Sequence, residues 1–179
     1  MKKFLAVLLV ALVALTSVFA GARTLTLTNT VDDVPASFEV FYGDKENPTN
    51  KLEDQHNDTV DSLESGKRYF EVKFSANSAS DKDSGLSVTF NNGPFVHTST
   101  NANDAKDNMK VDTTLTFESV AADGTVTTIE NNKVNVTYAK YNKIDNALVA
   151  KGTLSWSNDK DLVAGDYKCI VTVLISTND

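Results

Sequence analysis

Apolar and polar residues alternate one by one along most of the chain after residue 23. Thr24–Val31 shows this most plainly, with Leu25, Leu27, Asn29 and Val31 on one face and threonines on the other. A period of two residues indicates a half-buried β-strand, and no window carries a clear apolar stripe at helical spacing. The same pattern predicts further strands over residues 37–42, 69–75, 86–90, 111–120, 125–129, 133–140, 148–156 and 166–176.

Turn-forming residues separate these predicted strands. Asp123-Gly124 predicts a tight hairpin, and the polar tracts 46–62 and 98–107 are expected to be surface loops. Residues 50–63 have room for a short turn of helix. Many short strands joined by polar turns, with no helices between them, predict an all-β fold. We expect an antiparallel β-sandwich of the immunoglobulin-like kind.

The first 22 residues have the three parts of a secretory signal peptide. Lys2 and Lys3 precede an uncharged apolar stretch over residues 4–15, and small residues follow up to Ala20 and Ala22. The apolar stretch is shorter than the ~20 residues that a membrane-spanning helix needs. We expect cleavage after Ala22, one sandwich domain over residues 23–179, and export through the periplasm to the cell surface or the medium, with no membrane span in the mature chain.

Charge and cysteine content exclude other classes of protein. The chain carries 17 basic and 24 acidic residues, a formal net charge of -7, which is the wrong sign for holding a nucleic acid backbone. The single cysteine, Cys169, has no partner within the chain, so no internal disulfide is expected. Its apolar neighbours favour burial over an intermolecular bridge.

Residues that carry chemistry form no recognisable catalytic or metal motif. His56 and His97 lie in loop-like or strand-edge surroundings, and the chain lacks a Gly-x-Ser-x-Gly elbow. The oxygen-rich segments 81–85 and 101–107 are interpreted as solvated turns rather than calcium loops. We therefore expect no enzyme activity, no catalytic residue, no cofactor and no metal ion. Four aromatic residues are candidates for a sugar-binding platform, although Trp156 is expected in the core: Trp156, Tyr138, Tyr141 and Tyr42.

The two ends of the mature chain together suggest a family. At the N-terminus the alternating segment runs from Leu25 to Val31-Asp32, and near the C-terminus Ala164-Gly165-Asp166-Tyr167 leads into a last strand that is apolar on both faces. That composition predicts a central strand of a sheet. This combination resembles the pilins of the chaperone/usher pathways, particularly the colonisation-factor type, and less closely the spore-coat-U-like secreted proteins.

The resemblance implies an immunoglobulin-like sandwich that lacks one strand. In such pilins the N-terminal extension of the next subunit fills the open groove as a donor strand, which generates a head-to-tail polymer. Carried over to this chain, residues 23–32 are the extension, and the groove-filling positions are Leu25, Leu27, Asn29 and Val31. The implied partners are copies of the same chain, a periplasmic chaperone and an outer-membrane usher, and the implied function is a surface fimbria that supports adhesion.

Two alternatives explain the same residues. Thr24–Val31 has the alternation expected of the first strand of a complete sandwich, because periodicity is the same in either role. A self-contained sandwich would instead use the 46–62 and 98–107 loops to bind a carbohydrate, a protein or calcium. A small secreted hydrolase that uses acidic residues is a third and weaker hypothesis.

Overall fold

The computed structural model describes residues 34–53, 57–77, 84–139 and 143–177. The chain divides into two compact units, Met1–Asp32 and Asp33–Asp179, and every described residue belongs to the second unit. The predicted signal peptide over 1–22 and the predicted donor segment over 23–32 therefore lie outside the described residues.

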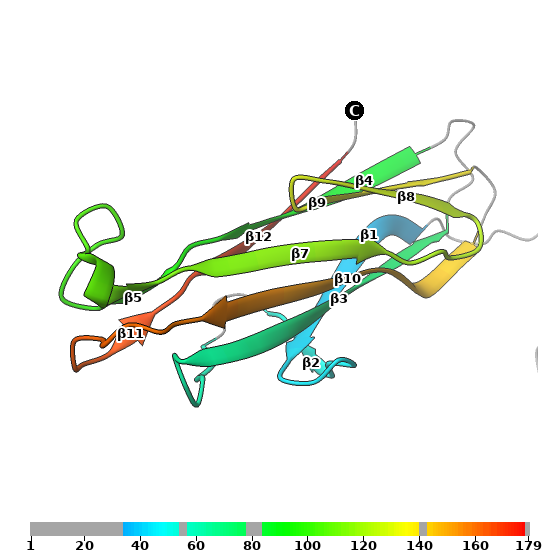
Figure 1. Ribbon diagram of the computed structural model, residues 1–179. Helices are drawn as coiled ribbons and strands as arrows, with labels where there is room; N and C mark the ends of the chain where they lie inside the picture. The colour runs from blue at the N-terminus through cyan, green and yellow to red at the C-terminus, as the bar shows by residue number, and fades with distance from the viewer. Residues whose placement is uncertain (1–33, 54–56, 78–83, 140–142, 178–179) are drawn as a thin grey trace, which may run out of the picture. The chain divides into compact units, whose positions relative to one another are not determined.

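The second unit is an antiparallel β-sandwich (Figure 1). Its five-stranded sheet has the order β2-β1-β3-β10-β7, formed by β2 (Asn50–Lys51), β1 (Val34–Gly43), β3 (Ser65–Asn77), β10 (Lys143–Ser157) and β7 (Thr113–Ser119). Its four-stranded sheet has the order β12-β4-β9-β8, formed by β12 (Val171–Thr177), β4 (Ser84–Asn92), β9 (Lys133–Tyr138) and β8 (Thr125–Glu130). A small third sheet has the order β11-β5-β6, formed by β11 (Tyr167–Lys168), β5 (Phe95–His97) and β6 (Lys110–Val111), and η1 (Asp107–Met109) precedes β6.

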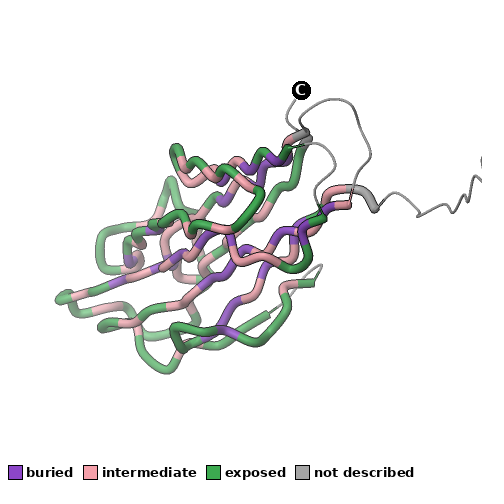
Figure 2. The backbone as a smooth tube through the Cα atoms, turned by 90° about the vertical axis from the view of Figure 1, so that its right-hand side faces the viewer, coloured by how far each residue is buried: buried purple, intermediate pink, exposed green. Residues whose placement is uncertain are grey.

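The core lies between the five-stranded and four-stranded sheets because alternate residues of both point inward. Figure 2 shows buried residues alternating with more exposed ones along the strands. Val72 and Phe74 of β3 pack in one cluster with Val88 of β4 and Val134 of β9. Aromatic rings fill its centre, with the Phe90 and Phe117 rings 4.4 Å apart. A second, smaller cluster consists of Phe95, Val111 and Trp156.

The strand order is that of an immunoglobulin-like sandwich. In chain order, β1, β3, β7 and β10 take the places of strands A, B, D and E, and β4 and β12 take those of C and F. The β8–β9 hairpin extends the second sheet on the far side of β4. No described strand takes the place of G, which would lie beside β12.

The predicted all-β sandwich is confirmed, and strands occur within each predicted stretch of the described residues, although the 111–120 stretch is divided between β6 and β7. Three details of the prediction are wrong. Asp123-Gly124 does not form a hairpin, because it links β7 of one sheet to β8 of the other; the tight hairpin is at Asn131-Asn132, between β8 and β9. Residues 50–51 form a short strand, and the described residues of 50–63 contain no helix.

The third wrong detail concerns the last strand. The sequence predicts one central strand over residues 166–176, but the pairing breaks after Lys168, and β12 is an edge strand bonded only to β4 among the described strands. Its composition is that of a strand with neighbours on both sides. Ile175 on the groove side is 53% exposed, and Leu174 on the outer face of the sheet is 56% exposed.

Candidate functional site: a groove between two strand edges

The first wall of the candidate site is the outer edge of β12. Gly93 N donates a hydrogen bond to Ile170 O at 3.0 Å, and Thr172 then pairs with Asn91 across the β4–β12 ladder. Because main-chain groups alternate in direction along an antiparallel strand, Val171, Val173 and Ile175 direct their N–H and C=O groups away from β4. No described strand lies along that side of β12, so this edge offers a row of donors and acceptors.

The second wall is the outer edge of β1. Leu52 N donates to Val40 O at 2.7 Å from the side opposite β3, which shows that Val40 and Phe38 direct their main-chain groups outward. The short strand β2 covers only Phe41 and Tyr42 of this edge. Within the described residues, the β1 edge around Phe38 therefore lacks a partner strand.

A groove of about 1020 Å³ lies between these two edges. Phe38 and Val40 of β1 line it on one side, and Val171, Val173 and Ile175 of β12 line it on the other. Val171 and Val173 also pack against the main core. The site is thus a groove with an apolar floor that is continuous with the core, lined also by polar residues and bounded by two strand edges, which is the form of site that accepts an extended chain by strand addition.

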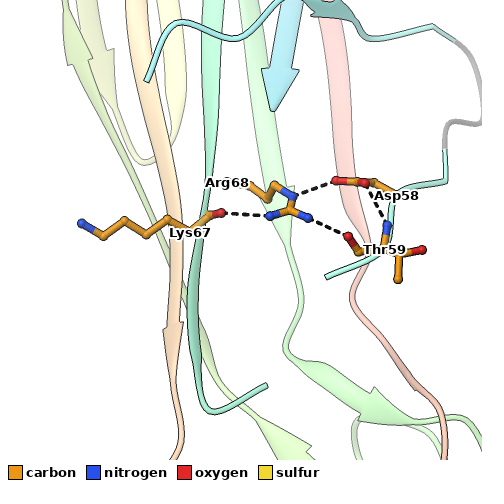
Figure 3. Close-up of polar contacts among 4 residues, drawn as sticks. All are labelled: Asp58, Thr59, Lys67 and Arg68. Atoms are coloured by element: carbon orange, nitrogen blue, oxygen red, sulfur yellow. Dashed lines mark hydrogen bonds and ion pairs between the residues drawn. The ribbon is translucent and has the colours of Figure 1, made fainter. Parts of the chain in front are cut away.

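A strap of residues 57–63 closes one end of the groove, and Arg68 of β3 holds it in place. Arg68 Nε donates to Asp58 Oδ2 at 2.7 Å and an Arg68 Nη donates to Thr59 O at 2.7 Å (Figure 3). The Trp156 indole N–H donates to Ser62 O at 3.1 Å, and Val60 packs against the smaller core cluster. This end is therefore a fixed wall with polar groups on it.

A second pocket of about 160 Å³ lies beside this end of the groove and shares Asp58, Val60 and Cys169 with its lining. Cys169 lines both cavities, and its thiol donates to Gly93 O at 3.1 Å. Burial raises the pKa of this thiol to about 11, so the thiol is protonated at neutral pH. Burial and the Asp58 carboxylate raise the pKa of the Tyr42 hydroxyl in the same pocket, while Arg68 lowers it. This end of the groove thus combines apolar walls with several polar side chains.

Cys169 is partly buried, in keeping with its apolar neighbours: it packs against both core clusters and also lines the groove. It has no disulfide partner among the described residues. Among the predicted aromatic platform residues, Trp156, Tyr138 and Tyr42 are buried, which disfavours a sugar-binding surface, and Tyr141 lies outside the described residues. His97 contacts Ser99, Ala164 O and the Tyr167 ring at one end of the small sheet.

The predicted groove-filling residues Leu25, Leu27, Asn29 and Val31 lie outside the described residues, so their role stays a prediction. The groove-lining residues of β1 and β12 are not part of the site that the sequence predicts. One sequence feature could have indicated the residues of β12: residues 170–175 are apolar on both faces, which is unusual for an edge strand.

The oxygen-rich turn near Asn101 has a structural role. The side chain of Asn101 accepts from the Asn103 and Asp104 amides and donates to Asp104, which is the geometry of a turn. Within the described residues, no group of three or more His, Cys, Asp or Glu side chains is placed to hold a metal ion. No helix in this part of the chain has the length and apolar character needed to cross a membrane.

No model of a known protein family matches the sequence, and no curated protein matches it either.

Proposed function

We propose that the protein is a non-enzymatic structural subunit of a surface fimbria that polymerises by donating its N-terminal strand to the groove of the next subunit. The observation that carries this proposal is the unpaired outer edge of β12, whose Val171 and Val173 pack on the core and border a groove with an apolar floor. Exposed apolar edge strands are liabilities that monomeric proteins normally cover or charge. A donated strand covers this one.

The N-terminal segment has the properties that the groove requires. Leu25, Leu27 and Val31 present branched apolar side chains on one face, and each contributes about 1.5 to 3 kcal/mol if fully buried. Val171, Val173 and Ile175 each offer one N–H and one C=O to an incoming main chain. Each of those hydrogen bonds contributes roughly 0.5 to 1.5 kcal/mol net.

Donation between copies produces an open filament. The donor segment and the groove are different surfaces, so each contact is head-to-tail and leaves one donor and one groove free at the two ends. Until assembly, an exported subunit of this kind needs its groove protected, which is the role expected of a periplasmic chaperone. An outer-membrane usher and an adhesive role at the cell surface complete the proposal.

Two complementary variants test the proposal on the chain that begins at Arg23. Leu27→Asp removes the donor function and leaves the groove intact, whereas Val173→Asp removes the groove and leaves the donor intact. We expect neither variant to polymerise alone, and an equimolar mixture to form dimers that grow no further. Native gel electrophoresis and mass photometry measure the species.

Matched controls lie one residue away on the opposite faces. Thr26→Asp and Leu174→Asp place the same charge on the same strands but on the faces turned away from the groove, and we expect both variants to polymerise like the unaltered chain. Thermal unfolding monitored by circular dichroism verifies that each variant is folded. Polymers formed by folded Leu27→Asp alone would overturn the proposal.

A further inference from the structure

We infer that Asn29 sets the register of the donated strand, by entering the polar end of the groove beside Cys169 while Leu27 and Leu25 lie on Val171 and Val173. The inference rests on the proposed donor-strand function and adds to it the alignment and the direction of the inserted segment. The occupant is the segment Arg23–Asp33 of a second copy, which ends where β1 begins.

Apolar side chains of β1 and β12 form the floor of the groove, polar residues such as Glu39 and Lys51 also line it, and Asp58 lies at the Cys169 end. The residues of β12 that face it are Val171, Val173 and Ile175, and opposite them lie Phe38 and Val40 of β1. Cys169 precedes Val171 by two residues and faces the same side of the chain, and its thiol donates to Gly93 O. Asp58 and Arg68 line the second pocket, of about 160 Å³, together with Cys169.

The donor segment carries one polar residue on its apolar face. Reading along that face gives Leu25, Leu27, Asn29 and Val31. A leucine placed against Cys169, Asp58 and Arg68 would exclude water from these polar groups and offer them no hydrogen bond in return. Burying polar groups in this way costs free energy. The Asn29 amide has two N–H donors and an acceptor oxygen, so it can form hydrogen bonds at that end.

This match also selects the direction. If Asn29 lies opposite Cys169 and the donor runs antiparallel to β12, Leu27 faces Val171 and Leu25 faces Val173. If the donor runs parallel, both leucines pass beyond Cys169 toward Gly165, and Val173 is left uncovered. Only the antiparallel arrangement therefore satisfies the apolar and polar ends together. A single buried polar residue is an established device for fixing register where apolar contacts alone would permit slippage.

Disulfide trapping measures the register directly. The probe is a synthetic peptide of residues Arg23–Asp33. The acceptor is the chain from Arg23 with Leu27→Asp, which keeps the groove free of donor segments from other copies, and with Cys169→Ser and Val171→Cys, which leave one thiol on the groove wall. Three peptides keep Asn29 and carry Leu25→Cys, Leu27→Cys or Val31→Cys. Diamide accepts the two electrons and two protons released when two thiols join, and mass spectrometry quantifies the adduct.

We expect the Leu27→Cys peptide to form the adduct and the other two to form little, because a disulfide requires Cα atoms about 4.4 to 6.8 Å apart. Adding Asn29→Leu to the cysteine peptides should remove this preference, so that adducts form at more than one position. Val31→Leu is the matched control and should preserve the preference for position 27.

The outcomes separate the two proposals. Preferential adduct formation by the Leu25→Cys or Val31→Cys peptide would overturn the register while leaving strand donation intact. Retention of the position 27 preference with Asn29→Leu would overturn the role of Asn29. If the unaltered peptide fails to shift the melting temperature of the folded Leu27→Asp chain and fails to bind it in calorimetry, strand donation itself fails.

Discussion

The Arg68 guanidinium of β3 binds Asp58, with Nε 2.7 Å from Oδ2, and the same side chain donates to Thr59 O. Arg68 lies ten positions after Asp58 in the chain. This contact therefore binds the strap of residues 57–63 to β3, the strand that follows it. The strap forms the end wall of the groove and lines the pocket that holds Cys169. Arg68 therefore helps to shape this end of the groove, together with the Trp156 hydrogen bond to Ser62 O.

Replacing Arg68 with alanine should destabilise the sandwich. Arg68 is only 18% exposed, whereas Asp58 is 44% exposed, so solvent screens part of the attraction. Losing the charged hydrogen bonds should lower the free energy of unfolding by about 1 to 3 kcal/mol. Urea denaturation measures the change. Lys51→Ala breaks the more exposed Lys51–Glu39 pair and should change stability by less than about 1 kcal/mol. Equal effects of the two variants would contradict the expectation.

Gly152 should not tolerate a side chain. A Cβ atom at this position of β10 would meet the ring of Phe117, which packs against Phe90 in the core. Gly152→Ala should therefore cost about 1 to 3 kcal/mol through overpacking, measured as a lower urea midpoint. Gly93→Ala is the matched control, because a Cβ there has no neighbour within 4 Å and the Gly93 amide stays available to Ile170 O. Comparable losses in both variants would argue against steric overlap as the cause.

The β8–β9 hairpin depends on two asparagines in the left-handed region. Asn131 and Asn132 have φ values of 49° and 60°, as a two-residue type I′ turn requires. Asn132→Ala should lower the free energy of unfolding by roughly 1 to 2 kcal/mol, because a Cβ without a compensating polar group is disfavoured there. Asn132→Gly should be neutral or stabilising. Thermal melts of the two variants should move apart, and a stabilised alanine variant would contradict the assignment of the turn.

The thiol of Cys169 should titrate well above an ordinary cysteine. Burial raises its pKa from 9.0 to about 11, so at pH 8 the native protein holds on the order of 100-fold less thiolate than an unfolded chain. Iodoacetamide should label the native protein correspondingly slowly, with a rate that rises toward pH 11. A midpoint near pH 9 in the folded protein would contradict this. Cys169→Ser provides the unlabelled control.

The same shift has a consequence for stability. The folded state disfavours the thiolate, so the contribution of the buried neutral thiol is complete below about pH 9 and declines as the pH rises toward 11. Cys169→Ser should remove this part of the pH dependence. Urea midpoints of the two proteins at pH 8 and pH 10.5 measure the difference, after reduction to keep the thiol free.

Local alternation is sufficient to predict most strands, because each strand of the sandwich has an inner and an outer face that its own residues specify. Residues 133–138, for example, alternate as their burial does in β9. The positions of strands within a sheet are set by contacts between residues far apart in the chain, which alternation does not report. For this reason the sequence predicts a hairpin at Asp123-Gly124, although that segment crosses between the sheets.

The candidate site is even less accessible from sequence. A groove arises where a strand edge lacks a partner strand. The apolar composition of residues 170–175 instead predicts a central strand, which has a partner strand at each edge. Only the pairing of β12 with β4 shows that one side lacks a described partner. The second pocket likewise requires Asp58, Arg68 and Cys169 to meet from separate parts of the chain.

Two adjacent residues of β12 distinguish binding of the peptide in the groove from non-specific binding to the outer face of the sheet. Val173 faces the groove and packs on the core, whereas Leu174 is 56% exposed and lies on the opposite face by alternation. Both can be replaced by threonine, which keeps the β propensity and adds a hydroxyl. Val173→Thr should weaken binding of the Arg23–Asp33 peptide about tenfold, which corresponds to about 1.4 kcal/mol, because a hydroxyl then meets Leu25. Leu174→Thr should leave the affinity unchanged. Isothermal titration calorimetry measures both, and a larger loss with Leu174→Thr would place the peptide on the outer face of the sheet instead of in the groove.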